Sequence, residues 1–73
     1  MLVLVKTKDG VEKAINITNA EFEATRNTQD ASLFDLKIFK ENGEIIETTI
    51  TEESYTSLIE ALQRESKMIS LTQ

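Results

Sequence analysis

Four stretches of the chain alternate between apolar and polar residues, in two pairs that each flank a glycine. The four stretches are residues 2–7, 11–18, 33–40 and 44–50. Alternation with a period of two residues is typical of strands with one buried face. Gly10 and Gly43, each at the end of a three-residue gap between stretches, indicate tight turns. The pattern therefore predicts two antiparallel hairpins.

The length of each turn follows from the residues that it sets opposite one another. In the second hairpin a two-residue turn would place Ile38 opposite Glu47, whereas a three-residue loop places Ile38 opposite Ile46. The same loop length in the first hairpin places Val3 opposite Ile15. It also sets opposite charges across from one another, which stabilises a sheet. The expected charge pairs are Lys6–Glu12, Lys37–Glu47 and Lys40–Glu44.

Residues 19–32 carry the weakest pattern. The apolar residues that alternate there are Ala20, Phe22 and Ala24. Thr18 and Glu21 have the spacing of a capping box, which would open a short helix instead. We favour a strand, because the apolar content is thin for an amphipathic helix. It would continue the second strand past a bend near Asn19 and pair with residues 33–39, leaving a polar loop before them.

A C-terminal helix is predicted to begin after Thr51 and to end near Ser66. Thr51 is a favourable N-cap, and Glu52 and Glu53 follow in the first turn, where the helix dipole favours acidic side chains. Beyond the helix, residues 68–71 alternate weakly and are read either as an added strand or as a tail. The apolar stripe of the helix consists of Tyr55, Leu58, Ile59 and Leu62.

These elements predict one α+β domain over residues 1–73. It is a small antiparallel β-meander of about four strands followed by one C-terminal α-helix packed on the sheet. One helix covers only one face of a sheet. The apolar residues expected on the other face are Leu2, Leu4, Phe39 and Ile45. Curling of the sheet into a partial barrel, which we favour, would bury them.

If the sheet stays open, the same side chains form a patch for self-association. A domain of 73 residues lies near the lower size limit for a self-sufficient core, which makes a homo-oligomer a reasonable expectation. The candidate oligomer interface consists of Phe39, Ile45, Met68, Ile69 and Leu71.

The composition argues against catalysis. The chain has no His and no Cys, so the commonest general base, nucleophile and metal ligands are missing. Its two glycines are assigned to hairpins, which leaves no phosphate-binding loop. We expect no enzyme activity, no cofactor and no metal. We also expect a cytoplasmic protein without membrane contact, since no secretory signal and no apolar run of about 20 residues is present.

Acidic residues are distributed unevenly. The chain has 13 acidic and 8 basic residues, and its net charge of −5 opposes direct binding to nucleic acid. Residues 1–40 are neutral overall, whereas residues 41–65 hold seven acidic residues against Arg64, a net charge of −6. This excess serves solubility or forms a surface for a basic protein partner. The candidate partner-binding residues are Glu41, Glu44, Glu47, Glu52, Glu53 and Glu60.

Small size, acidity and the missing catalytic residues resemble, in kind and without a shared motif, the accessory proteins of bacteriophages and mobile elements. Many of these proteins inhibit host enzymes that handle nucleic acid. The sequence thus suggests a non-enzymatic acidic binding protein that blocks a basic, nucleic-acid-binding site on a host protein. The alternative is a small structural subunit of a homo-oligomer or of a phage particle.

Overall fold

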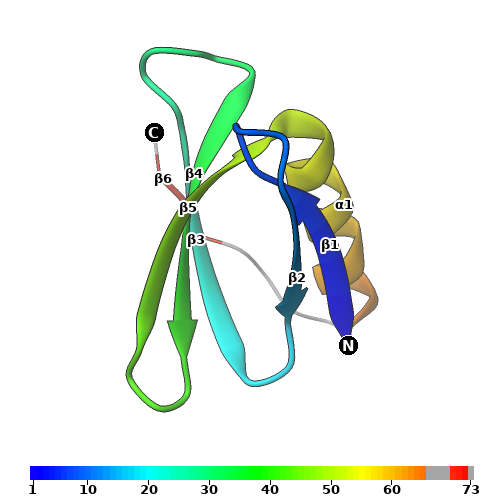
Figure 1. Cartoon of the computed structure of the whole chain (residues 1–73). Helices are drawn as coiled ribbons and strands as arrows, with labels where there is room; N and C mark the ends of the chain where they lie inside the picture. Colours follow the sequence, from blue (N-terminus) through cyan, green and yellow to red (C-terminus); the bar gives the residue numbers. More distant parts are fainter. Residues whose placement is uncertain (66–69, 73) are drawn as a thin grey trace.

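The computed structural model describes residues 1–65 and 70–72, and the elements follow the predicted order. The elements are β1 (Leu2–Lys6), β2 (Glu12–Asn16), β3 (Ala20–Arg26), β4 (Leu33–Lys40), β5 (Ile45–Thr51), α1 (Glu52–Arg64) and β6 (Ser70–Thr72). The predicted α+β class is confirmed. Five antiparallel strands precede one helix that packs on β1, β4 and β5 (Figure 1).

Both hairpins have the predicted register. Val3 lies opposite Ile15, and Ile38 lies opposite Ile46. Gly10 and Gly43 have φ angles of +81° and +90°, so a three-residue loop with a left-handed glycine closes each hairpin. The three predicted charge pairs face one another in register or across the turn. Among the described residues only Lys40 and Glu44 form an ion pair, with 3.6 Å between Nζ and Oε1.

Residues 20–26 form the favoured strand, and the predicted bend near Asn19 divides the long second strand in two. Asn19 has a φ of +58°, a left-handed conformation that Asn adopts more readily than most residues. As a result β2 pairs only with β1 among the described strands, while β3 belongs to a second sheet of order β5-β4-β3-β6. The two sheets touch where Thr7 bridges to Ile50 and Lys8 N donates to Thr49 O at 3.0 Å.

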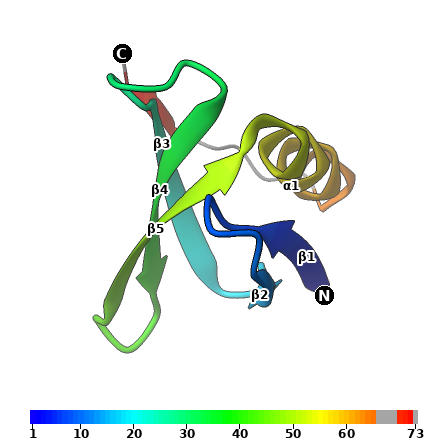
Figure 2. The same cartoon turned by 45° about the horizontal axis from the view of Figure 1, so that its top comes forward.

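The helix is capped as predicted. The Oγ1 of Thr51 accepts a hydrogen bond from Ser54 N at 3.3 Å, and the helix ends at Arg64, close to the predicted end. The helix and the β1–β2 hairpin lie side by side on one face of the β3–β4–β5 sheet (Figures 1 and 2). The core between these layers consists of Val5, Ile15, Ile17, Phe22, Ala24, Phe34, Leu36, Ile38, Ile50, Leu58, Ala61 and Leu62.

The end of the chain returns to the sheet as a parallel strand. β6 runs beside β3 with Leu71 opposite Ala24. The reading of this segment as an added strand therefore holds for Ser70–Thr72. Met68 and Ile69 lie outside the described residues.

The expected burial of the outward-facing apolar residues is wrong for three of the four. Leu2, Leu4 and Ile45 are 67%, 63% and 55% exposed, and only Phe39 is half-buried. The reason is the layering. The helix and the first hairpin share the same face of the second sheet, so no described element covers the outer face of either sheet (Figure 2).

Candidate binding surfaces

The structure separates the predicted acidic residues into groups at the two ends of β5. Glu41 and Glu44 flank the turn between β4 and β5, whereas Glu52 and Glu53 form the first turn of α1 (Figure 1). At about 3.3 Å per residue, β5 holds these pairs roughly 20 Å apart. Glu47 lies between them on the outer face of β5, and Glu60 lies further along α1. All six side chains are exposed.

The charges at the hairpin end are partly balanced. Lys40 is ion-paired with Glu44. Lys37 lies between Glu23 and Glu47 in a cross-strand row on the outer sheet face. These two lysines reduce the negative electrostatic potential that the neighbouring glutamates would present to a basic partner.

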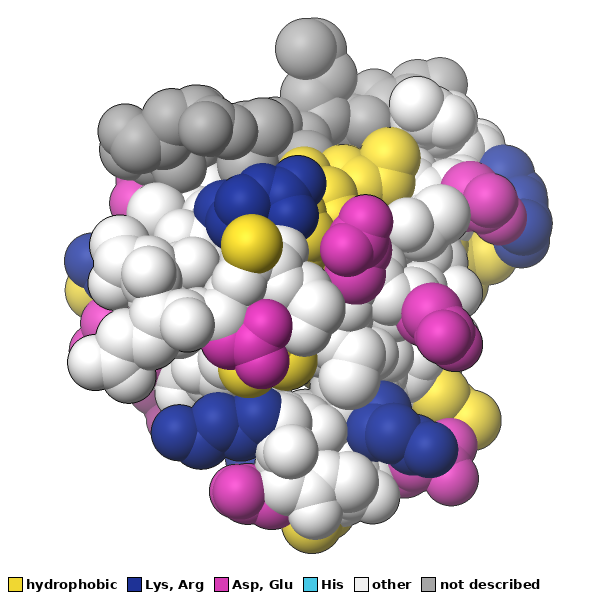
Figure 3. All heavy atoms as spheres, turned by 90° about the horizontal axis from the view of Figure 1, so that it is seen from above, with side chains coloured by type: hydrophobic (Ala, Val, Ile, Leu, Met, Phe, Trp, Pro, Cys, Tyr) yellow, Lys and Arg dark blue, Asp and Glu magenta, His cyan; other side chains and the backbone are white. Residues whose placement is uncertain are grey.

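At the helix start, no described cation lies within 4.0 Å of Glu52 or Glu53, which is true of every described acidic residue except Glu44. The positive end of the helix dipole offsets part of their charge and holds them in place. On the end of the molecule shown in Figure 3, acidic and basic side chains are interspersed among polar ones. Glu52 and Glu53 differ from the other acidic residues in being adjacent in the sequence and held together in the first turn of a helix, and we call them the helix-start acids.

Of the predicted oligomer interface, the structure brings Phe39 and Ile45 together. They are cross-strand neighbours on β4 and β5, on the sheet face that no described element covers. Glu21 of β3 continues this row on the other side of Phe39. Leu71 lies opposite Ala24, three residues along β3 from Glu21. The interface residues within the described part of the chain are thus one apolar pair and a strand at the sheet edge.

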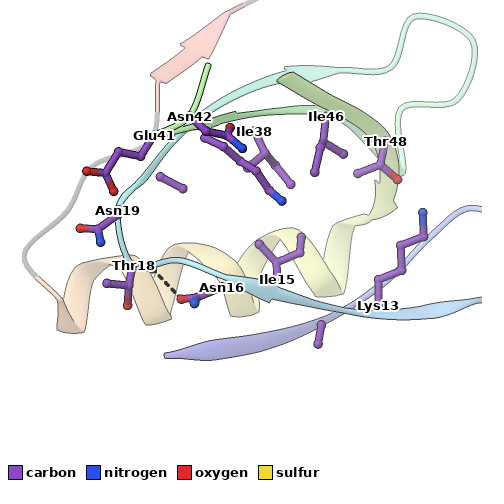
Figure 4. Close-up of a pocket in the computed structure, with 13 residues that line it drawn as sticks. Lys13, Ile15, Asn16, Thr18, Asn19, Ile38, Glu41, Asn42, Ile46 and Thr48 are labelled. Carbon is purple, nitrogen blue, oxygen red and sulfur yellow. Dashed lines mark hydrogen bonds between the residues drawn. The ribbon is translucent and has the colours of Figure 1, made fainter. Parts of the chain in front are cut away.

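The sequence reasoning missed a groove between the two sheets. It encloses about 530 Å³ between β2 and the inner face of the β4–β5 hairpin. Ile15 points from β2 towards Ile38 and Ile46 on the opposite wall, while Lys13 and Glu41 lie at its two ends (Figure 4). The groove is therefore an apolar slot with a charged residue of opposite sign at each end.

One signal in the sequence could have indicated the groove. Lys13 shares the inward face of β2 with Ile15 and Ile17, a position where the alternation calls for an apolar residue. Thr48 interrupts β5 in the same way between Ile46 and Ile50. Polar residues at two inward positions indicate that the core opens there.

The polar side chains with defined partners have structural roles. The buried hydroxyl of Ser54 accepts a hydrogen bond from Lys6 N at 2.7 Å and another from the Thr51 hydroxyl at 3.0 Å, which ties α1 to β1. In the loop after β3, hydrogen bonds from the Ser32 hydroxyl and from Ser32 N lower the pKa of Asp30. These groups stabilise caps and turns.

Within residues 1–65 and 70–72, no group of three or more potential ligands is placed to hold a metal ion. The described helix is neither long nor apolar enough to cross a membrane. No family model matches the chain, and neither a curated protein nor a solved structure shows significant similarity to it. The chemistry of its surfaces is thus the basis for a functional proposal.

Proposed function

We propose that this chain is a non-enzymatic binding protein that presents its acidic residues to a basic, nucleic-acid-binding site on a partner protein and blocks that site. The observation that carries the proposal is the pair of helix-start acids, Glu52 and Glu53. Both side chains are exposed, and no described cation neutralises them. In this view the protein acts in the cytoplasm as an inhibitor of a host protein.

The physical basis is competition for cations. A nucleic-acid-binding site gathers Lys and Arg to contact phosphates, and binding releases counterions, so the affinity falls with salt. Carboxylates held at a helix start can bind the same Lys and Arg side chains in place of the phosphates. Complementary charge raises the association rate and disfavours wrong partners. The complex should therefore form rapidly and dissociate at moderate salt.

Charge neutralisation tests which acidic residues are used. The tagged protein would be immobilised, exposed to a bacterial lysate and eluted with stepwise salt, and retained proteins would be identified by mass spectrometry. The test variant replaces Glu52 and Glu53 by Gln, and a second variant replaces Glu41 and Glu44. A matched control replaces Glu12 and Glu21 by Gln. These side chains are also exposed, and their replacement removes the same charge from the neutral half of the chain.

We expect one basic protein to be retained by the control variant and by the wild type. Loss of the two helix-start charges should weaken its binding about tenfold, since surface ion pairs contribute up to about 1 kcal/mol each. If the control variant weakened binding of the partner equally, the effect would be due to net charge alone. That result would contradict a specific role for Glu52 and Glu53. Unchanged retention by both acidic-surface variants would refute the proposal.

A second function, a structural subunit of a homo-oligomer, is supported by the exposed row of Phe39 and Ile45. Two copies joined through this face would bury both side chains. Light scattering coupled to size exclusion tests it. Phe39→Gln should release monomers if the face is the interface, whereas Leu4→Gln, on the outer face of β1, should not. A wild-type chain that is monomeric at high concentration would exclude this role.

A further inference from the structure

The outer edge of β2 is an open strand edge. Val11 O accepts from Thr7 N, and Ile17 N donates to Met1 O, so the backbone groups of these residues point to β1. Because the direction alternates along a strand, the N–H and C=O groups of every second residue between them, namely Glu12, Ala14 and Asn16, point away from β1. β2 has no neighbour on that side within the described chain. These groups are a template for one more strand.

This open edge faces the groove. Ala14 shares the outer face of the first hairpin with Leu4, so its methyl group points away from the core. Ala14 nevertheless lines the groove, which means that its backbone faces the slot. A strand added to β2 would therefore point every second side chain towards Ile15, Ile38 and Ile46 (Figure 4).

Charge defines which residue types lie at the two ends of the occupant. The charged residues that line the groove are Lys13, Lys40 and Glu41, and Lys40 is balanced by Glu44 outside it. Lys13 has no described ion-pair partner and lies at the end where β2 begins, while Glu41 lies at the other end (Figure 4). An antiparallel segment would therefore begin beside Glu41 and finish beside Lys13.

We propose that the groove binds an extended segment of a partner protein, which adds an antiparallel strand to the edge of β2. The segment carries two apolar side chains at alternate positions facing the isoleucines. A basic residue precedes them near Glu41, and an acidic residue follows them opposite Lys13. Main-chain hydrogen bonds hold the segment, and the groove selects its side chains. This site shares Glu41 with the candidate partner-binding residues but involves neither Glu52 nor Glu53, the two residues that carry the proposed function.

The test uses the capped peptide Lys-Thr-Ile-Thr-Val-Thr-Glu-Thr and measures the exchange of backbone amide hydrogens in the intact protein by NMR. In the proposed register the acidic residue faces Lys13, and the last three threonines pair with Asn16, Ala14 and Glu12. At about ten times the dissociation constant, exchange at Ala14 and Asn16 should slow about tenfold, because only free protein exchanges. Leu2 and Leu4 of β1, whose backbone N–H groups point to the opposite edge of the hairpin, should keep their rates.

Three controls separate strand addition from unspecific contact. The same peptide methylated on the nitrogen of its third threonine lacks the N–H that pairs with Ala14 and should not protect it. The reversed sequence, with its charges at the wrong ends, should bind more weakly. The Lys13→Glu variant should bind the original peptide about fivefold more weakly, and replacement of the peptide's glutamate by lysine should restore binding.

Absence of protection at Ala14 and Asn16, or equal protection by the methylated peptide, would overturn the proposal. Protection of these amides without peptide, rising with protein concentration, would assign the edge to a second copy of the chain and would also overturn it. Neither result depends on whether Glu52 and Glu53 bind a basic partner. The two proposals therefore stand or fall separately.

Discussion

The ring of Phe34 on β4 stacks on the ring of Tyr55 on α1, with 3.9 Å between ring centroids and 11° between ring planes. The guanidinium carbon of Arg26, the neighbour of Phe34 on β3, lies 4.5 Å from the centroid of the same phenyl ring. Phe34 is 3% exposed and belongs to the core. One side chain of the sheet thus fixes both the helix and the end of β3.

The stack should be measurable as a coupling energy. Phe34→Leu and Tyr55→Leu keep apolar bulk and remove the ring contact. In a double-mutant cycle from urea unfolding, we expect a coupling of about 0.5–1.5 kcal/mol, the usual range for an aromatic pair. The control cycle combines Tyr55→Leu with Phe39→Leu, whose ring lies on the opposite sheet face, and should give a coupling near zero. Equal couplings in the two cycles would show that the stack contributes nothing specific.

Ser54 offers a matched comparison with Ser57 on the same helix. Ser54→Ala removes the acceptor for Lys6 N in a part-buried position and should lower the free energy of unfolding by about 1–3 kcal/mol. Ser57→Ala changes an exposed serine and should raise stability by a few tenths of a kcal/mol through helix propensity. Thermal unfolding of both variants checks the difference. Similar effects at the two positions would contradict the role of Ser54 in joining α1 to β1.

The hairpins and the helix were predictable because local physics determines them. A glycine in the turn and the preference for apolar residues opposite one another place Val3 opposite Ile15 and Ile38 opposite Ile46. Thr51 followed by two glutamates marks the helix start. For residues 20–26 the sequence left a choice between a strand and a short helix. The strand forms although its apolar residues are few, because each of them faces the core.

The layering and the groove were not predictable from local pattern. Whether α1 and the first hairpin share a face of the sheet depends on the bend at Asn19 and on packing between distant segments. This arrangement left Leu2, Leu4 and Ile45 exposed, contrary to expectation. It also placed Lys13 at the mouth of a slot. The acidic residues were identified by composition, but their separation by the length of β5 is a property of the fold.

Gly43 tests the backbone requirement of the second turn. Its φ of +90° is unfavourable for an L-residue, although a Cβ atom there would meet nothing within 4 Å. Gly43→Ala should therefore cost about 1–2 kcal/mol through conformation alone. A chemically synthesised chain with D-alanine at this position should lose no stability, since D-residues favour positive φ. Equal destabilisation by both enantiomers in urea unfolding would point to a steric cause instead.

Asp30 makes a prediction about pH. The hydroxyl of Ser32 donates to Asp30 Oδ1 at 2.6 Å and Ser32 N donates at 3.0 Å, and these bonds lower the pKa of Asp30 from its ordinary value of 3.8. Because the folded-state pKa is depressed, the resulting stability is present above pH 3.8 and is lost as the pH falls through the folded-state pKa.

Ser32→Ala removes the larger of the two contributions and should raise the pKa of Asp30 towards 3.8. A carbon-13 NMR titration of the Asp30 carboxyl group measures this change. Ser57→Ala, remote in sequence from the loop, should leave the titration where it is in the wild type. An unchanged pKa of Asp30 in the Ser32 variant would contradict the hydrogen-bond explanation.

The central claim is that the acidic residues occupy a nucleic-acid-binding site. It is tested most directly by adding this protein to a captured basic partner already bound to fluorescently labelled DNA and measuring the anisotropy of the DNA. The account predicts that the wild-type chain releases the DNA, and that at the same salt concentration the Glu52→Gln, Glu53→Gln variant needs about tenfold more protein for the same release. Binding of the chain to the partner while the DNA stays bound would contradict the account.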